Sequence, residues 1–119
     1  MERAKTLFID IDGTLLHHYG EGIVQVHKRG KLLPGVLKQM DAWDRKGYNI
    51  ILTTGRRESQ RQKTEEQLLK AKIPYDRLIM GLGGGARVII NDTKPNSKIP
   101  TAFAITVPRN GGLREIEDV

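Results

Sequence analysis

The sequence predicts an α/β fold built on a single open, mostly parallel sheet flanked by helices. Short apolar runs alternate with longer amphipathic segments, which is typical of successive strand–helix–strand units. Glycine and proline residues separate these segments. Three of the apolar runs end in small polar residues, as strands do when their carboxyl ends form a binding site.

A central strand with both faces buried is expected at residues 6–9, because this run lacks the polar alternation of a strand that has one face in water. Residues 15–31 are polar and contain glycine, and Ile23, Val24 and Val26 suggest a short flap hairpin there. This insertion is too short for a folded cap domain, so we expect a fold without one.

A helix is expected over residues 34–46. Val36, Leu37, Met40 and Trp43 are spaced to share one face of it, and Gly47 is typical of the residue that follows a helix.

The second strand is expected at residues 48–52, and a long polar helix at about 58–72. Further short strands are expected at 78–80, 88–90 and 102–107. The link between 78–80 and 88–90 is shorter than the dozen or so residues of a parallel crossover. Residues 78–80 are therefore either a peripheral strand or an antiparallel partner of 88–90, and the sequence leaves both arrangements open.

Composition indicates one domain over residues 1–119, with no internal repeat or linker. Cysteine is absent, which excludes disulfides, thiolate zinc sites and a cysteine nucleophile. No apolar stretch approaches the ~20 residues of a membrane span, and no signal-peptide pattern is present, so we expect a cytoplasmic protein without a membrane partner. The net charge of +6 favours anionic partners such as phosphorylated metabolites, nucleotides or nucleic acid.

A pair of acidic residues follows the first expected strand. Asp10 and Asp12 are two residues apart, so an extended backbone places both carboxylates on the same side. Gly13 permits a sharp turn after them. In a magnesium-assisted phosphoryl transfer, one carboxylate attacks phosphorus and the other shuttles the proton of the leaving group. A simple Asp-Gly turn explains only one of the two aspartates, so phosphoryl transfer is the favoured interpretation.

Two other expected strands also end in small polar residues. Since ligands of open α/β sheets bind beyond the carboxyl ends of the strands, we expect all three ends to form one polar site. The residues concerned are Thr53, Thr54, Gly55 and Arg56 after the second strand, and Asn91 and Asp92 after the strand at 88–90.

On these residues the chain resembles the haloacid dehalogenase-like (HAD) superfamily, particularly its small capless phosphatases. Asp10 and Asp12 match its D-x-D-G-T motif, Thr53 matches its second motif, and Asn91-Asp92 partly match its acidic fourth motif. The resemblance extends over about residues 5–107 and implies a Rossmann-like sheet of the HAD type.

The resemblance implies a phosphoric monoester hydrolase that works through an aspartyl-phosphate. Asp10 would be the nucleophile, and Asp12 would first protonate the leaving alcohol and then deprotonate the attacking water. Thr53, with backbone amides near Gly13 and Thr54, would hold the phosphoryl oxygens.

The resemblance also implies a Mg²⁺ ion, bound by Asp10, the backbone carbonyl of Asp12 and Asp92. Oxygen ligands suit this ion. Because two close carboxylates resist simultaneous ionisation, we expect the metal to keep Asp10 ionised while Asp12 holds the proton.

The chain departs from the family pattern in two places. The lysine that usually precedes the fourth motif is absent, and Arg87 is slightly preferred over Lys63 and Lys94 as its replacement. An arginine that simply faces solvent is an equally good interpretation of Arg87. Asn91 stands where an acid is usual, which leaves Asp92 as the one clear carboxylate and predicts modest magnesium affinity.

The main expectation for the substrate is a small phosphorylated metabolite such as a sugar phosphate. The open site and the positive charge instead support a phosphatase acting on nucleic-acid termini or another macromolecule, and Arg56 is a candidate for binding phosphate there. The missing lysine and Asn91 support a weakly active module that binds phosphorylated ligands. A homo-oligomer is one way to cover a capless site. The sequence fixes neither the substrate nor the pathway.

Overall fold

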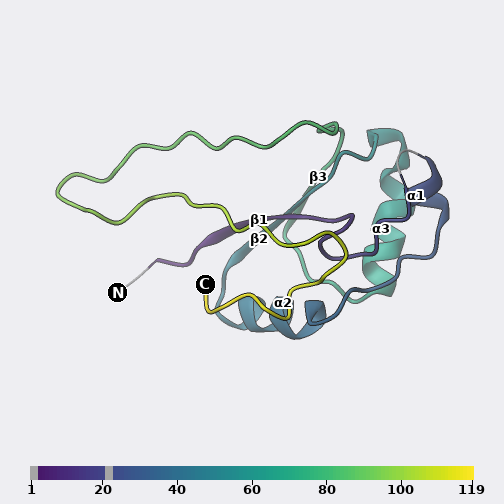
Figure 1. The fold of residues 1–119 in the computed structure, drawn as a ribbon, viewed down its shortest axis with the longest axis horizontal. Coiled ribbons are helices and arrows are strands. Elements are labelled where there is room, and N and C mark those ends of the chain that lie inside the picture. The colour runs from purple at the N-terminus through teal and green to yellow at the C-terminus, as the bar shows by residue number, and fades with distance from the viewer. Residues whose placement is uncertain (1–2, 21–22) are drawn as a thin grey trace.

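The structure, a computed structural model, describes residues 3–20 and 23–119. A three-stranded parallel sheet lies at its centre, in the order β1-β2-β3. The strands are β1 (Thr6–Asp10), β2 (Asn49–Thr53) and β3 (Arg77–Ile79). This arrangement confirms the predicted α/β fold with a parallel sheet (Figure 1).

The register of the sheet aligns the carboxyl ends of the strands. Asp10 is the partner of Thr53 across β1 and β2, and Thr53 is the partner of Ile79 across β2 and β3. β1 and β3 are therefore the edge strands of this sheet, and β3 is reached from β2 through a helix. The prediction that residues 6–9 form a central strand buried on both faces is wrong, because β2 is the central strand and Phe8 is 55% exposed. Of the two arrangements that the sequence leaves open for residues 78–80, the peripheral strand is correct.

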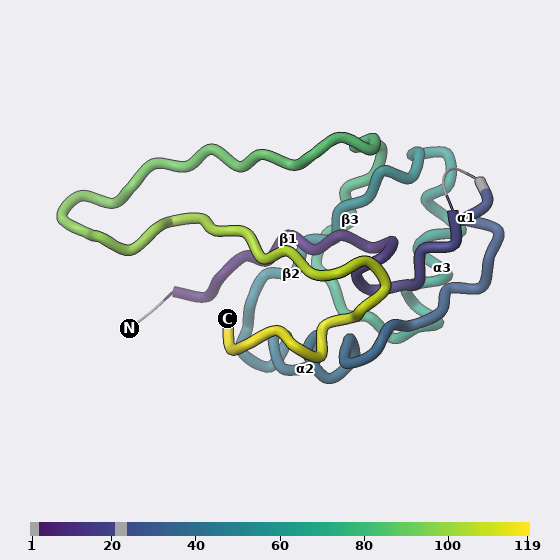
Figure 2. The backbone as a smooth tube through the Cα atoms, viewed as in Figure 1, coloured from purple at the N-terminus to yellow at the C-terminus, as the bar shows by residue number. Residues whose placement is uncertain are grey.

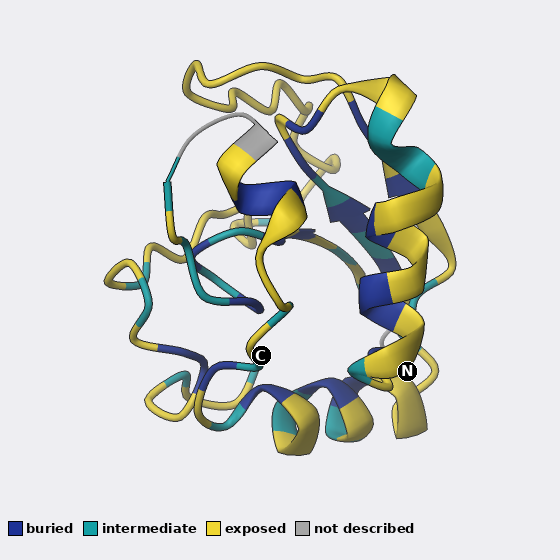
Figure 3. Cartoon of the chain, turned by 90° about the vertical axis from the view of Figure 1, so that its right-hand side faces the viewer, coloured by how far each residue is buried: buried dark blue, intermediate teal, exposed yellow. Residues whose placement is uncertain are grey.

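Two helices pack against the sheet, as the sequence predicts. α2 (Val36–Arg45) buries Val36, Met40 and Trp43, whereas Leu37, predicted for the same face, is exposed. α3 (Arg61–Lys70) follows a short 3-10 helix, η1 (Glu58–Gln60), and buries Leu68. Figure 3 shows the inward side of α2 as buried and its outward side as exposed, which is the pattern of an amphipathic helix on a core.

The core lies between the sheet and these helices and includes residues from both ends of the chain. Removing this apolar surface from water is the main favourable contribution to folding. Its buried members are Ile9, Ile11, Leu15, Leu16, Leu33, Val36, Met40, Trp43, Ile50, Leu52, Leu68, Ile73, Leu78, Met80 and Leu113.

The flap differs from its prediction. Instead of a hairpin, the structure has a short helix, α1 (Ile23–His27). Gln25 and Val26 are buried while Val24 is exposed, so neighbours in sequence share the inward side as they do in a helical turn. Strand pairing in the described part of this region consists of isolated bridges at the base of the flap, a parallel one between Asp12 and Leu16 and an antiparallel one between Leu16 and Leu32.

The strands predicted at 88–90 and 102–107 are wrong. Residues 82–107, which we call the extended arm, leave the sheet in irregular backbone and return beside it (Figures 1 and 2). Val88 and Ile90 are 80% and 90% exposed. A run of β-branched residues favours a strand only when a neighbouring strand completes its hydrogen bonds, and the described chain offers these runs no such partner.

The arm is fastened at both roots. The N–H groups of Gly81 and Leu82 donate to the carbonyls of Arg56 and Thr54, at 2.7 and 3.2 Å. On the return side, Leu113 N–H donates to Pro34 O at 2.9 Å. The chain then runs along α2 to its end (Figure 1). Within the described residues, no helix has the length and apolar character needed to span a membrane.

Candidate active site

The ends of β1 and β2 bring the first two predicted motifs together. Asp10 and Thr53 are neighbours across the two strands, and the Thr14 hydroxyl donates to Asp10 Oδ2 at 3.4 Å. Gly13 has a φ of 89°, a conformation that favours glycine. The turn after β1 therefore depends on glycine, as the sequence indicates.

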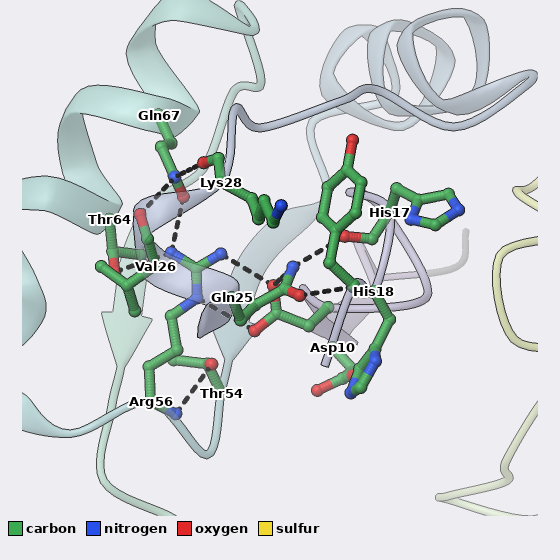
Figure 4. A network of polar contacts seen from close by, with 12 residues as sticks. Asp10, His17, His18, Gln25, Val26, Lys28, Thr54, Arg56, Thr64 and Gln67 are labelled. Carbon is green, nitrogen blue, oxygen red and sulfur yellow. Dashed lines mark hydrogen bonds and ion pairs between the residues drawn. The ribbon is translucent and has the colours of Figure 1, made fainter. Parts of the chain in front are cut away.

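Asp12 is held by a two-pronged ion pair with Arg56. Arg56 Nε donates to Oδ2 at 2.9 Å, and Nη2 donates to Oδ1 at 2.7 Å. The side chains are 3% exposed for Arg56 and 15% exposed for Asp12. Bidentate geometry and exclusion of water make this a strong and directional contact. Figure 4 shows the network of polar contacts around the Arg56 guanidinium.

The rest of the Arg56 guanidinium binds helix α3. Its Nη1 donates to Thr64 Oγ1 at 3.0 Å and to Gln67 Oε1 at 2.6 Å. The prediction that Arg56 binds substrate phosphate is therefore corrected, because this side chain is buried and its guanidinium donates hydrogen bonds to protein groups. A sequence motif shows that an arginine follows the strand but not which way it turns.

A glutamine from the flap holds Asp12 from the other side. Gln25 Nε2 donates to Asp12 Oδ1 at 2.8 Å and to His17 O at 2.7 Å. Its Oε1 accepts from Tyr19 N–H at 2.7 Å. Sequence reasoning missed Gln25, although a single amide inside the apolar run of residues 23–26 was a signal for a buried polar contact.

The predicted phosphate cradle is only partly formed. Gly13 N–H donates to Leu16 O at 2.7 Å, and Thr54 N–H donates to Ile79 O at 3.0 Å. Both amides expected to hold phosphoryl oxygens are thus already bonded. The Thr54 side chain is buried and accepts from Arg56 N–H at 3.1 Å. Thr53 keeps its predicted place beside Asp10.

Gly55 allows two loops to approach closely. A Cβ atom at this position would lie 2.7 Å from Gly83 O, a distance that real side chains do not tolerate. The loop after β2 and the glycine-rich root of the arm therefore pack backbone against backbone. This contact explains Gly55 better than the predicted contact with substrate.

Arg87 is positioned by the same glycine-rich root. Its Nη1 donates to Gly85 O at 2.6 Å and its Nη2 donates to Gly83 O at 3.1 Å. Its positive charge is close enough to Asp10 to lower the pKa of that carboxyl. The structure therefore places the Arg87 charge near Asp10, the predicted nucleophile, and supplies a cation where the HAD pattern has a lysine.

The electrostatics of Asp10 are those of a carboxylate short of positive charge. Partial desolvation by the surrounding protein raises the pKa of Asp10, and the neighbouring Asp12 charge raises it further, while Arg87 and the Thr14 hydrogen bond oppose both effects. A divalent cation beside Asp10 would favour the ionised carboxylate and so offset both effects that raise the pKa. The Asp10 carboxylate and the Asp12 carbonyl thus fit one side of a magnesium site, since both offer the oxygen ligands that the ion prefers.

Asp92 is not brought to this site. It lies exposed in the extended arm, as does Asn91, and its backbone carbonyl accepts a hydrogen bond from the Thr101 hydroxyl. Among residues 3–20 and 23–119, no three acidic, histidine or cysteine side chains are grouped closely enough to hold a metal ion. The expected meeting of Asp92 with Asp10 depends on the strand that the arm does not form.

The returning chain adds residues that the sequence analysis did not single out. Asn110 N–H donates to Gly13 O at 2.8 Å, and Asn110 Oδ1 accepts from His18 N–H at 2.7 Å. A Cβ at Gly13 would lie 3.2 Å from Arg109 Cγ, so the exposed Arg109 covers this turn. No motif surrounds Arg109, and only the fold reveals its position.

Comparison with known proteins gives one family and several similar structures. The family model described as the phosphatase domain of polynucleotide kinase PNKP matches residues 4–90. A solved chain of the Pnkp1/Rnl/Hen1 RNA repair complex is 29% identical, with a TM-score of 0.57 over 80% of this chain. A second chain from a Pnkp1/Rnl/Hen1 complex is 30% identical, with a TM-score of 0.57 over 71% of this chain.

This chain spans only 28% and 31% of the length of those two solved chains. A structural-genomics protein from Vibrio cholerae is 21% identical, with a TM-score of 0.53 over 74% of this chain and 79% of its own, which supports the fold alone. No curated protein is significantly similar in sequence.

The Asp12–Arg56 ion pair predicts a large loss of stability when its cation is removed. Arg56→Met should lower the free energy of unfolding by about 3–5 kcal/mol, because a buried carboxylate loses its partner. Urea unfolding followed by circular dichroism measures this loss. Arg57→Met is the control, since Arg57 is exposed, and it should change stability by no more than ~0.5 kcal/mol. Equal effects of the two changes would contradict the structural role of Arg56.

The raised pKa of Asp10 predicts a pH-dependent cost to the metal-free fold. An acid whose pKa is higher in the folded state binds more protons there, so its cost is absent at low pH and develops as pH rises through the folded pKa. With EDTA present, Asp10→Asn should be more stable than the wild type at neutral pH, and the difference should vanish towards about pH 3. Urea titrations across pH measure it, with Asp44→Asn as an exposed control. A less stable Asp10→Asn at neutral pH would contradict the assignment.

Proposed function

Because the chain belongs to the family of polynucleotide kinase PNKP phosphatase domains, we propose that this HAD-type phosphoric monoester hydrolase removes a terminal phosphate from a nucleic acid. The family match over residues 4–90 is the observation that carries the proposal. A similar solved chain comes from an RNA repair complex, which adds support. The family and this relative favour the nucleic-acid alternative over the small metabolite that was the main expectation from sequence.

The open surroundings of Asp10 support a large substrate. The flap contributes only the five-residue helix α1, and Asp10 itself is exposed. Arg87 and Arg109 supply positive charge near the β1 turn from two different segments. With a net charge of +6, these features suit a polyanion whose end enters the site while the remainder stays outside.

The proposed reaction has two steps. A carboxylate oxygen of Asp10 attacks phosphorus, the bond from phosphorus to the sugar oxygen breaks, and that oxygen takes a proton from Asp12. Water then attacks the aspartyl-phosphate, passes a proton to Asp12 and releases inorganic phosphate, which restores both aspartates. Thr53, next to Asp10 at the end of β2, is proposed to donate its hydroxyl to a phosphoryl oxygen.

A magnesium ion is part of the proposal. Asp10 and the backbone carbonyl of Asp12 would hold it, with Asp92 as a third ligand once the extended arm lies over the site. Bound there, the ion would neutralise the repulsion between the nucleophile and the phosphate. Arg87, at the root of the arm, is proposed to reduce the same repulsion with its positive charge. The raised pKa of Asp10 supports a cation at this place.

Asp92→Asn tests the third ligand without relying on turnover. If Asp92 binds the ion, Mg²⁺ should raise the melting temperature of the variant less than that of the wild type, because ligand binding stabilises the fold by mass action. The apparent dissociation constant for Mg²⁺ should increase about tenfold or more. Asp44→Asn serves as the control. An unchanged magnesium titration in Asp92→Asn would exclude Asp92 as a ligand.

The substrate class is tested with oligonucleotides carrying a terminal phosphate, compared with sugar phosphates and nucleoside monophosphates. We expect the highest kcat/KM on oligonucleotides and a steep fall of that value with salt, since binding releases counterions from the phosphate backbone. Arg109→Gln should raise KM for oligonucleotides and reduce the dependence of their kcat/KM on salt, while KM for sugar phosphates should change little. Asp10→Asn should abolish all turnover.

Other outcomes identify the alternatives. Equal kcat/KM for sugar phosphates and oligonucleotides, without a salt effect, would support the small-metabolite reading. No wild-type turnover on any class with Mg²⁺ present would support a module that only binds phosphorylated ligands.

A further inference from the structure

Every polar atom of the Gln25 side chain has a partner. The amide nitrogen donates to Asp12 Oδ1 and to His17 O, and the amide oxygen accepts from Tyr19 N–H, at 2.7 to 2.8 Å. The carbonyl of His17 and the N–H of Tyr19 fix which end of the amide is which. Gln25 is 5% exposed. It is therefore a rigid donor aimed at Asp12.

Asp12 is gripped from two opposite elements. Arg56, from the loop after β2, donates to both oxygens, and Gln25, from α1, donates to Oδ1. Two donors from different directions set the position and rotation of a carboxylate more narrowly than either does alone. We propose that Gln25 is the positioning residue that aligns Asp12 for proton transfer to the leaving group, an inference that rests on the proposed phosphatase function.

A second glutamine ties the same helix to the same arginine. Gln67 Nε2 donates to Val26 O at 3.1 Å and to Lys28 O at 2.9 Å, while its Oε1 accepts from Arg56 Nη1. Figure 4 shows these contacts as one network around Arg56. The contacts close a ring that runs from Asp12 through Gln25, α1, Gln67 and Arg56 back to Asp12. The position of α1 thus affects Asp12 in two ways, directly through Gln25 and indirectly through Gln67 and Arg56.

The chemistry supplies a selective readout. A sugar hydroxyl is a poor leaving group and needs a proton as its bond to phosphorus breaks, whereas p-nitrophenolate leaves without one. kcat/KM reports the steps up to release of this group. A misaligned Asp12 should therefore slow the cleavage of a sugar ester and leave formation of the phosphoenzyme from p-nitrophenyl phosphate largely unaffected.

The test uses Gln25→Leu, which removes the amide at similar volume, and Gln25→Asn, which keeps the amide but withdraws it by one methylene. Both should lower kcat/KM for a terminally phosphorylated oligonucleotide by about tenfold or more, because small misplacements of a catalytic group are costly. kcat/KM for p-nitrophenyl phosphate should stay within about twofold, and phosphoenzyme should accumulate, since Asp12 also activates the water. Gln39→Leu is the matched control, as it removes a similar amide that donates to Ile116 O at 3.2 Å.

Equal losses on both substrates in Gln25→Asn, or no loss on either, would overturn the positioning role. Amide hydrogen exchange gives a second readout that needs no turnover: the Tyr19 N–H should exchange faster in Gln25→Leu than in the wild type, and an unchanged rate would refute the anchoring. Absence of wild-type activity on both esters would instead refute the proposed function.

Discussion

The buried ion pair between Asp12 and Arg56 is the contact on which the site depends. Arg56 reaches across from the end of β2, holds Asp12 with two hydrogen bonds and holds α3 with two more. Taking two charges out of water is costly, and only complete hydrogen bonding offsets that cost. Gln25 therefore helps to offset the cost of enclosing Asp12, and Thr64 and Gln67 help to offset the cost of burying Arg56.

The two aspartates of one motif have different environments. Asp12 is enclosed and surrounded by donors, whereas Asp10 faces the open mouth with a raised pKa and little compensation. Both oxygens of Asp12 accept hydrogen bonds from Arg56 or Gln25, whereas the Thr14 hydroxyl donates to Asp10 at 3.4 Å. A site that is incomplete without a cation has this kind of asymmetry, because one carboxylate is fixed by protein and the other is left for the ligand.

Sequence patterns predicted the sheet, α2, α3 and the meeting of Asp10 with Thr53, because periodicity and strand-end motifs are local signals. They failed for the flap and the arm. In the flap, the Gln25 side chain bonds to Asp12, His17 and Tyr19, which lie outside α1, and the periodicity of a short segment does not reveal such contacts. In the arm, β-branched runs such as Val88–Ile90 indicate strands, but a strand needs a neighbour that no local pattern supplies. The direction of the Arg56 side chain could not be predicted either, because a sequence motif does not specify a rotamer.

Both ends of the extended arm are bonded to loops of the candidate active site. One is bonded through Gly81 and Leu82 to the backbone that carries Arg56, and the close approach of Gly55 to Gly83 locks that junction. The other reaches the β1 turn through the bond from Asn110 to Gly13. A ligand or force that displaces the arm would therefore act on the Arg56 loop and on the β1 turn together, because backbone hydrogen bonds connect the two ends of the arm to these two segments.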